Sequence, residues 1–237
     1  MIKIEKITKK FNDLIAVDNL SLDVKEGEIL CLLGANGAGK STTINMLLNF
    51  IKPSSGVAKI NELDALKNPI DTKKFLTYIP ENLMLYPTLT AVENLDYFCK
   101  LSGKKFDKLE LKLYLTAAGL QQDAHNNRVK TFSKGMRQKV GIALAIAKES
   151  KVLLLDEPTS GLDPKSSNEF MELLTKMKND GVAILMATHD LFRAKEVSTH
   201  IGIMRSGKLE NYSNSSELSL KELETIYLDI MNFKNVN

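Results

Sequence analysis

The sequence lacks several features that would place it outside ordinary globular proteins. Tryptophan is absent, and cysteine occurs twice among 237 residues. The longest apolar runs, Ile29–Leu33, Val152–Leu155 and Val182–Ala187, have strand length and fall short of the roughly 20 residues that cross a bilayer. The first ten residues contain no apolar signal-peptide core, so we expect a chain that is not exported.

The cysteines and the charge balance exclude further classes. Cys31 lies in an apolar run and Cys99 in a helical pattern, without the spacing of metal ligands, so both are expected to be reduced core or surface residues of a cytosolic protein. The 32 basic and 29 acidic residues are intermixed and leave a formal net charge of +3. Because DNA-binding proteins usually concentrate excess charge on one face or arm, we expect no nucleic-acid partner.

What the sequence does contain is an alternation of strands and helices. Ile2–Glu5 and Leu20–Val24 alternate apolar and polar residues, which predicts half-buried antiparallel strands. Strand-like apolar runs with helical segments between them indicate a mostly parallel sheet covered on both sides. These runs are Ile29–Leu33, Val152–Leu155, Val182–Ala187 and Ile201–Met204.

The middle of the chain changes character. From about Leu83 to Glu149 the pattern is helical throughout, with apolar residues three and four apart in Val92–Leu101 and Lys108–Ala118. We interpret this block as a helical insertion in the α/β core. Other helices are expected at Ser41–Ile51, before Pro53, and around Leu220–Phe233, after a turn at Gly207.

The segment Gly34–Ser41 carries the strongest motif. It fits the phosphate-loop pattern G-x-x-x-x-G-K-S/T at every fixed position, with a buried strand before it and a helix after it. Glycines let successive N–H groups converge on one anion, and the helix adds the positive end of its dipole. The loop predicts binding of a nucleoside triphosphate. The nucleotide-binding candidates here are Gly34, Asn36, Gly37, Ala38, Gly39, Lys40, Ser41 and Thr42.

Four side chains around this loop are given chemical roles. Lys40 is expected to reach the β- and γ-phosphates, and the Ser41 hydroxyl to ligate Mg²⁺. The apolar run at 152–155 ends in Asp156 and Glu157, at the sheet edge where ligands bind in such folds. Asp156 suits Mg²⁺, directly or through water, and Glu157 suits the general base that activates the attacking water. Alone, this pattern equally describes a strand that ends in a solvated turn.

The segment Phe132–Gln138 is a second candidate anion site. Ser133 is a plausible N-cap for the helix that follows, and Arg137 and Lys139 add positive potential. Two phosphate sites for one nucleotide suggest a dimer in which each partner completes the other's site. Taken alone, the segment would be an ordinary capped helix.

The order of these motifs resembles that of ABC-type ATP-binding proteins, over nearly the whole chain. The resemblance implies an α/β fold with a P-loop NTPase core, a mostly parallel sheet, an N-terminal antiparallel β subdomain and an inserted helical subdomain. It also implies ATP and Mg²⁺ as ligands. The matching residues are Gly34–Ser41, Ser133-Lys134-Gly135, Asp156-Glu157, Ser160-Gly161-Leu162-Asp163 and His189.

The resemblance also implies roles for residues outside the phosphate loop. His189 would hold the γ-phosphate and the attacking water, and Phe11 would stack on adenine, with a core or surface phenylalanine as the alternative. Ser133 and Gly135 would contact the γ-phosphate bound to the opposite subunit, and Ser160–Asp163 would link the two sites across the dimer. No role is assigned to His125 or His200.

Two departures from the family pattern stand out. The signature turn, usually LSGGQ, is Phe132-Ser133-Lys134-Gly135-Met136, a variant that resembles exporters of the ABC-2 type. Glu81 replaces the usual glutamine, whose carbonyl lies near Mg²⁺; a carboxylate can still ligate the metal. The Glu81 variant resembles the ATPases of bacitracin-type and lantibiotic-type peptide exporters. Alternatively, Glu81 keeps the usual mechanical role without bearing on the substrate.

The sequence therefore predicts one ABC ATP-binding domain over residues 1–237. We expect a nucleotide-binding core at 1–82 and 151–205, a helical subdomain at 83–150 and a C-terminal tail at 206–237. The protein should form an ATP-dependent head-to-tail homodimer, or a heterodimer with a similar subunit, at the cytoplasmic face of the membrane. It should energise a separate multi-span permease that docks on Glu81–Leu101, for export of a drug, an antimicrobial peptide or a similar substrate. Apolar candidates for that surface are Leu83, Met84, Leu85, Tyr86 and Leu89, with buried core as the preferred alternative for some of them.

Two other functions would require different sequence features. A soluble ABC ATPase acting on ribosomes or DNA would carry two cassettes or a long coiled coil, and the sequence has one cassette and no heptad run. A non-catalytic nucleotide-binding regulator would be expected to lack Glu157 or His189, and both are present.

Overall fold

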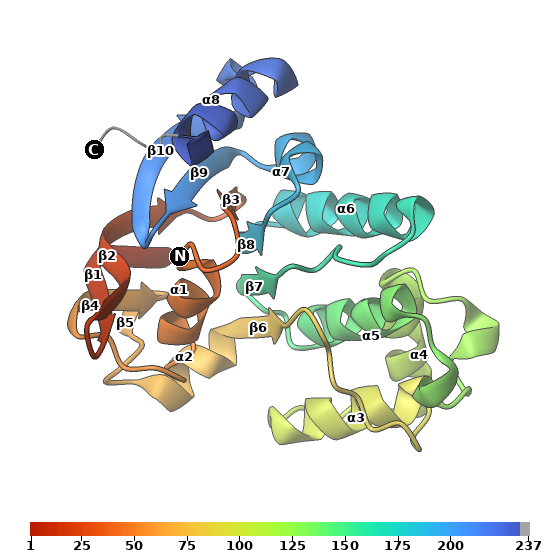
Figure 1. Ribbon diagram of the computed structural model, residues 1–237. Coiled ribbons are helices and arrows are strands. Elements are labelled where there is room, and N and C mark those ends of the chain that lie inside the picture. The colour runs from red at the N-terminus through yellow and green to blue at the C-terminus, as the bar shows by residue number, and fades with distance from the viewer. Residues whose placement is uncertain (233–237) are drawn as a thin grey trace.

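The computed structural model describes residues 1–232, and its strands form two sheets (Figure 1). The smaller sheet is antiparallel, in the order β2-β1-β4-β5. It confirms the two antiparallel strands predicted near the N-terminus and adds two strands that were not predicted. Its members are β1 (Ile2–Phe11), β2 (Leu14–Val24), β4 (Ser55–Ile60) and β5 (Leu63–Asp64).

The larger sheet has six strands in the order β10-β9-β3-β8-β7-β6. All its neighbours pair in parallel except β9 and β10, which pair antiparallel. The mostly parallel sheet is therefore confirmed. Its strands are β3 (Ile29–Leu33), β6 (Leu76–Ile79), β7 (Val152–Asp156), β8 (Ala183–Thr188), β9 (His200–Arg205) and β10 (Lys208–Asn214).

Eight α-helices lie within residues 1–232. In Figure 1, α3, α4 and α5 lie together at the lower right, on the opposite side from the antiparallel sheet. No helix in the described part of the chain combines the length and apolar character of a membrane span. The helices are α1 (Lys40–Leu47), α2 (Pro69–Phe75), α3 (Ala91–Leu101), α4 (Lys108–Ala117), α5 (Lys134–Ala147), α6 (Pro164–Asn179), α7 (Leu191–Val197) and α8 (Leu220–Asn232).

Strand β3 divides the interior into two cores. All five of its side chains are buried, because both faces of the central strand are covered. Ile29, Cys31 and Leu33 pack in the core formed with the helices on one face. Leu30 and Leu32 pack in the core formed with the antiparallel sheet and α1. The carboxyl end of β3, where the phosphate loop begins, is therefore held from both sides.

The helix expected at Ser41–Ile51 is shorter than predicted. It ends at Leu47, because Asn49 adopts a left-handed conformation with φ of 55° and the N–H groups of Phe50 and Ile51 both donate to the carbonyl of Asn45. The chain has thus already left the helix before it reaches Pro53. Phe233, the last residue of the helix predicted at the C-terminus, lies outside the described residues.

The block at 83–149 was predicted to be helical throughout, and this prediction is wrong. Residues 80–90 form a loop, which the fully buried Asn94 of α3 holds by accepting from the N–H of Tyr86 and donating to its carbonyl. Strands β6 and β10 were also missed. Strand β6 has only four residues, too few to show a period, although three of them are buried. Strand β10 alternates only between exposed and half-buried residues, so its sequence carries no apolar pattern.

Candidate functional site

The phosphate loop connects β3 to α1. Gly39 caps α1 with φ of 104°, and a Cβ at this position would lie 2.6 Å from the carbonyl oxygen of Ala16. Both the backbone conformation and the close approach of β2 therefore require glycine. The loop therefore lies between the six-stranded sheet and the antiparallel sheet.

Lys40 is almost completely buried beneath this loop, at 5% exposure. Its Nζ donates to the carbonyls of Gly34, at 2.5 Å, and Ala35, at 3.2 Å, and lies 3.7 Å from Oε1 of Glu157. Burial lowers the pKa of Lys40, against the opposing effect of Glu157 and Asp156. A buried cation held only by loop carbonyls and a distant carboxylate is suited to bind a phosphate.

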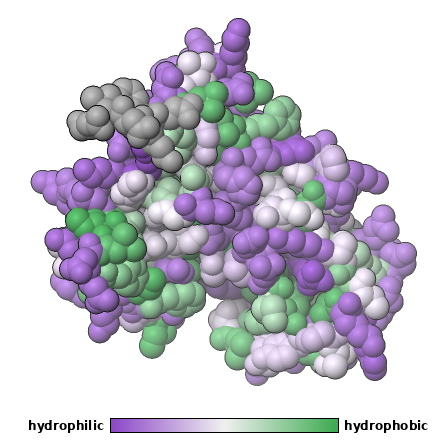
Figure 2. Space-filling model, viewed as in Figure 1, coloured by the Kyte–Doolittle hydropathy of each residue, from purple (hydrophilic) through white to green (hydrophobic). Residues whose placement is uncertain are grey.

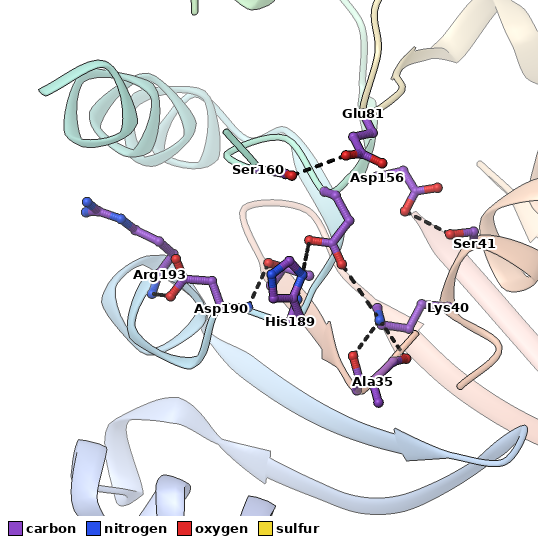
Figure 3. A network of polar contacts seen from close by, with 12 residues as sticks. Ala35, Lys40, Ser41, Glu81, Asp156, Ser160, His189, Asp190 and Arg193 are labelled. Carbon is purple, nitrogen blue, oxygen red and sulfur yellow. Dashed lines mark hydrogen bonds and ion pairs between the residues drawn. The ribbon is translucent and has the colours of Figure 1, made fainter. Parts of the chain in front are cut away.

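Asp156 and Ser41 bring two hard oxygen donors together at the edge of the sheet. Ser41 Oγ donates to Asp156 Oδ1 at 3.0 Å (Figure 3). Burial raises the pKa of Asp156, while the hydrogen bond from Ser41 lowers it. These oxygens fit a hard divalent cation such as Mg²⁺.

Glu157 and His189 meet at the ends of β7 and β8. Nδ1 of His189 lies 2.9 Å from Oε2 of Glu157, and the histidine backbone N–H lies 3.4 Å from the same oxygen. The Glu157 side chain is only 14% exposed, against 58% for His189. Among residues 1–232, the buried Oε1 of Glu157 has no hydrogen-bond partner. This oxygen is the one that faces Nζ of Lys40 at 3.7 Å.

These groups lie around one cleft of about 520 Å³, which is within the usual size of a small-molecule site. Figure 3 shows the Ser41–Asp156 pair close to Lys40 and His189. Glu157 contacts both Lys40 and His189. The predicted residues that line the cleft are Phe11, Asn36, Gly37, Ala38, Gly39, Lys40, Ser41, Thr42, Glu81, Asp156 and Glu157.

Four lining residues were not predicted: Leu14, Ile15, Ala16 and Ser206. They come from the β1–β2 hairpin and the β9–β10 turn, which join the loop through backbone contacts; Gly207 N–H, for instance, donates to the carbonyl of Ala38. No local motif marks these residues, because tertiary packing alone brings them to the cleft.

Five predicted residues do not line the cleft in the described structure: Gly34, Ser133, Gly135, Asp163 and His189. Gly34 and His189 each contact a residue that does: the Gly34 carbonyl accepts from Lys40, and His189 lies against Glu157. Ser133 caps α5 as predicted, with Oγ accepting from the N–H of Met136 at 3.3 Å. Gly135 packs against Ser166 and Leu162, and Asp163 caps α6. Ser133, Gly135 and Asp163 therefore each make structural contacts within this chain.

The model of the ABC transporter family matches residues 17–160. The chain belongs to the ABC transporter family. Among similar proteins, the ABC transporter ATP-binding protein NatA of Bacillus subtilis is 34% identical, with 88% of this chain and 87% of NatA aligned. The bacitracin transport ATP-binding protein BcrA of Bacillus licheniformis is 38% identical, over 88% of this chain and 68% of BcrA.

A third relative is much longer. The human phospholipid-transporting ATPase ABCA3 is 38% identical over 93% of this chain, which corresponds to 13% of ABCA3. Among solved structures, an ATP-binding subunit of an ABC transporter is 28% identical with a TM-score of 0.83, covering 96% of this chain and 99% of that one. A dimeric ATP-binding cassette bound to ADP and Pi after hydrolysis is 27% identical with a TM-score of 0.79, covering 91% and 99%.

These similarities confirm the predicted family, fold class and activity. The chain is an ABC ATP-binding protein with the P-loop NTPase fold, and it is an ATPase. The chain binds a nucleotide.

Proposed function

We propose that this ATPase energises export through a separate membrane permease, with Glu157 as the general base of hydrolysis. The observation that carries the assignment of the base is the position of Glu157. Its buried carboxylate is oriented by His189 at 2.9 Å, faces Lys40 at 3.7 Å and keeps one oxygen without a hydrogen bond. That oxygen can take the proton of a water that attacks the γ-phosphate.

We assign the neighbouring side chains to phosphate and metal binding. Lys40 would leave its loop carbonyls to contact the β- and γ-phosphates, and the exposed His189 would contact the γ-phosphate. Ser41, Asp156 and Glu81, which line the cleft, would hold Mg²⁺. When bound, Mg²⁺ would neutralise charge on the phosphate oxygens. Phe11, 41% exposed at the wall of the cleft, would stack on adenine.

The active unit is proposed to be a head-to-tail dimer, of two copies or of this chain with a similar subunit. Ser133 and Gly135 lie at the N-terminus of α5 and are not among the residues that line the chain's own cleft. In a dimer they would contact the nucleotide of the partner, and Ser160–Asp163 would lie between the two sites. The dimeric cassette with ADP and Pi supports the formation of a dimer.

The permease is proposed to dock on the surface of residues 81–101, at the cytoplasmic face of the membrane. Four large apolar or aromatic side chains there are exposed: Met84, Tyr86, Tyr97 and Leu101. Figure 2 shows apolar surface at the lower right, over the region where Figure 1 places α3. This surface belongs to the proposed helical subdomain, 83–150, with 1–82 and 151–205 as the nucleotide-binding core and 206–237 as the tail.

Export of a drug, an antimicrobial peptide or a similar substrate is the transport function we infer. BcrA, a bacitracin transport protein, and ABCA3, a phospholipid transporter, support this class. Purification from the membrane fraction should recover a multi-span partner. Recovery of a soluble particle with RNA would contradict the transport function.

The Glu157→Gln variant tests the assignment of the base. Glutamine keeps the size of the side chain but cannot take a proton at neutral pH. We expect ATP binding to persist, turnover to be lost and an ATP-dependent dimer to accumulate in gel filtration. Turnover at the wild-type rate would remove Glu157 from this role.

A further inference from the structure

The two departures from the family pattern, Glu81 and Lys134, are neighbours in the folded chain. Nζ of Lys134 lies 4.0 Å from Oε1 of Glu81, although the two residues are 53 positions apart in the sequence. The same Oε1 accepts a hydrogen bond from Ser160 Oγ at 3.2 Å (Figure 3). One carboxylate oxygen thus joins the loop after β6, the start of α5 and the loop after β7.

Helix α5 holds Lys134 in this place. Gln138, one turn along the helix and fully buried, points its Nε2 at the carbonyl of Pro80 at 3.5 Å. A Cβ on Gly141 would lie 2.9 Å from Leu83 and 3.1 Å from Ile79, so helix and loop are in close contact there. Positions 134, 138 and 141 share one face of the helix. This face packs along residues 79–83.

The charges of the two departures cancel. Glutamate in place of glutamine adds a negative charge to a cleft that already contains Asp156 and Glu157. Lysine in place of the first glycine of the usual signature turn adds a positive charge. The Lys134 side chain is 21% exposed and that of Glu81 49%, so water screens the pair only in part.

We propose that Lys134 is a positioning residue for Glu81: it neutralises the carboxylate and, with Ser160, holds it when no metal is bound. This role rests on the proposed function, in which Glu81 is a ligand of Mg²⁺. Lys134 and the metal then compete for the same carboxylate. Removing the charge of Lys134 strengthens the attraction between Glu81 and the cation, and does so only while Glu81 carries its own charge.

A double-mutant cycle on metal binding tests the proposal. A fluorescent ADP analogue reports binding while Mg²⁺ is titrated; ADP has no γ-phosphate, so a contact of Lys134 with a partner's γ-phosphate does not contribute. Lys134→Gln should lower the half-saturating Mg²⁺ concentration about two- to five-fold, the range of a partly exposed ion pair. In the Glu81→Gln background the same substitution should leave it unchanged. High salt should reduce the effect.

Two further variants serve as controls. Lys130→Gln removes the same charge from a lysine that, like Lys134, lines the small pocket beside residues 82–87, and it should leave the half-saturating Mg²⁺ concentration unchanged. Lys134→Arg keeps the charge and should restore the wild-type value. Thermal unfolding monitored by circular dichroism verifies that each variant is folded.

The outcomes separate this proposal from the one on which it rests. Equal shifts from Lys134→Gln with and without Glu81, or equal shifts from Lys134→Gln and Lys130→Gln, would overturn the pairing. Failure of the wild-type chain to bind the ADP analogue with Mg²⁺ would instead overturn the nucleotide site itself.

Discussion

Nδ1 of His189 lies 2.9 Å from Oε2 of Glu157, and the register of two parallel strands brings the residues together. Asp156, the last residue of β7, pairs with Ala187 of β8, so the residues that follow each strand emerge at the same edge. Glu157 itself has a positive φ of 45°, which points its side chain back over the cleft instead of along the strand. The sheet thus places the proposed base, Glu157, beside the histidine that contacts it.

The His189→Ala variant should lower kcat by about 100-fold and leave ATP affinity nearly unchanged, because Lys40 and the loop still hold the phosphates. Turnover and binding of a fluorescent ATP analogue measure the two effects. His200→Ala is a matched control, since His200 stacks on Tyr212 at a centroid distance of 5.4 Å. It should keep kcat within about two-fold. A comparable loss of kcat in both variants would show that the effect of His189→Ala is a general structural one.

The Asp156→Asn variant should be more stable than the wild-type chain at neutral pH in the absence of nucleotide and metal. Burial raises the pKa of Asp156 in the folded chain, so its charged form opposes folding above that pKa. The penalty disappears as the pH falls below the ordinary range of aspartate. We expect a Tm gain on the order of 2 °C at pH 7, vanishing below about pH 3, in thermal unfolding across pH. A gain independent of pH would contradict the assignment to this carboxylate.

The Asn94→Ala variant should destabilise the fold by about 2 kcal/mol, because it leaves buried backbone groups of the loop at 80–90 without partners. Asn94 accepts from the Tyr86 N–H and donates to the carbonyls of Tyr86 and Thr90. Denaturant unfolding measures the loss, and limited proteolysis should cleave the loop faster. Asn126→Ala, at an exposed site, should change neither. If the two variants unfold alike, Asn94 does not hold the loop.

Neither cysteine should react with a thiol reagent in the folded chain near neutral pH. Burial raises the pKa of both thiols, that of Cys99 to about 11, so the reactive thiolate is scarce. An Ellman assay should detect no fast-reacting thiol in buffer and both after unfolding in guanidinium chloride. Rapid labelling of the native chain would show that Cys31 or Cys99 is accessible.

Elements with a strong local signal were predictable. Strand β3 has the predicted bounds, because five consecutive apolar residues between a turn and the phosphate loop fit only a buried strand. The N-cap at Ser133 was also predicted. The extent of α1 was not, since its end depends on a left-handed Asn49 that no proline or glycine marks.

Among the site residues, the sequence by itself determined which chemical groups are available. The phosphate loop, Asp156, Glu157 and His189 are recognisable from short motifs, because a loop conformation and a strand end are local properties of the chain.

Only the tertiary structure decided how these groups meet. The pairing of Glu81 with Lys134, the orientation of Glu157 by His189 and the arrival of Ala16 and Ser206 at the cleft all depend on packing between distant segments. Sheet register and helix packing set these distances, and neither is encoded in the residues adjacent to each site. Two substitutions that are separate departures in the sequence therefore become, in the fold, one pair of opposite charges.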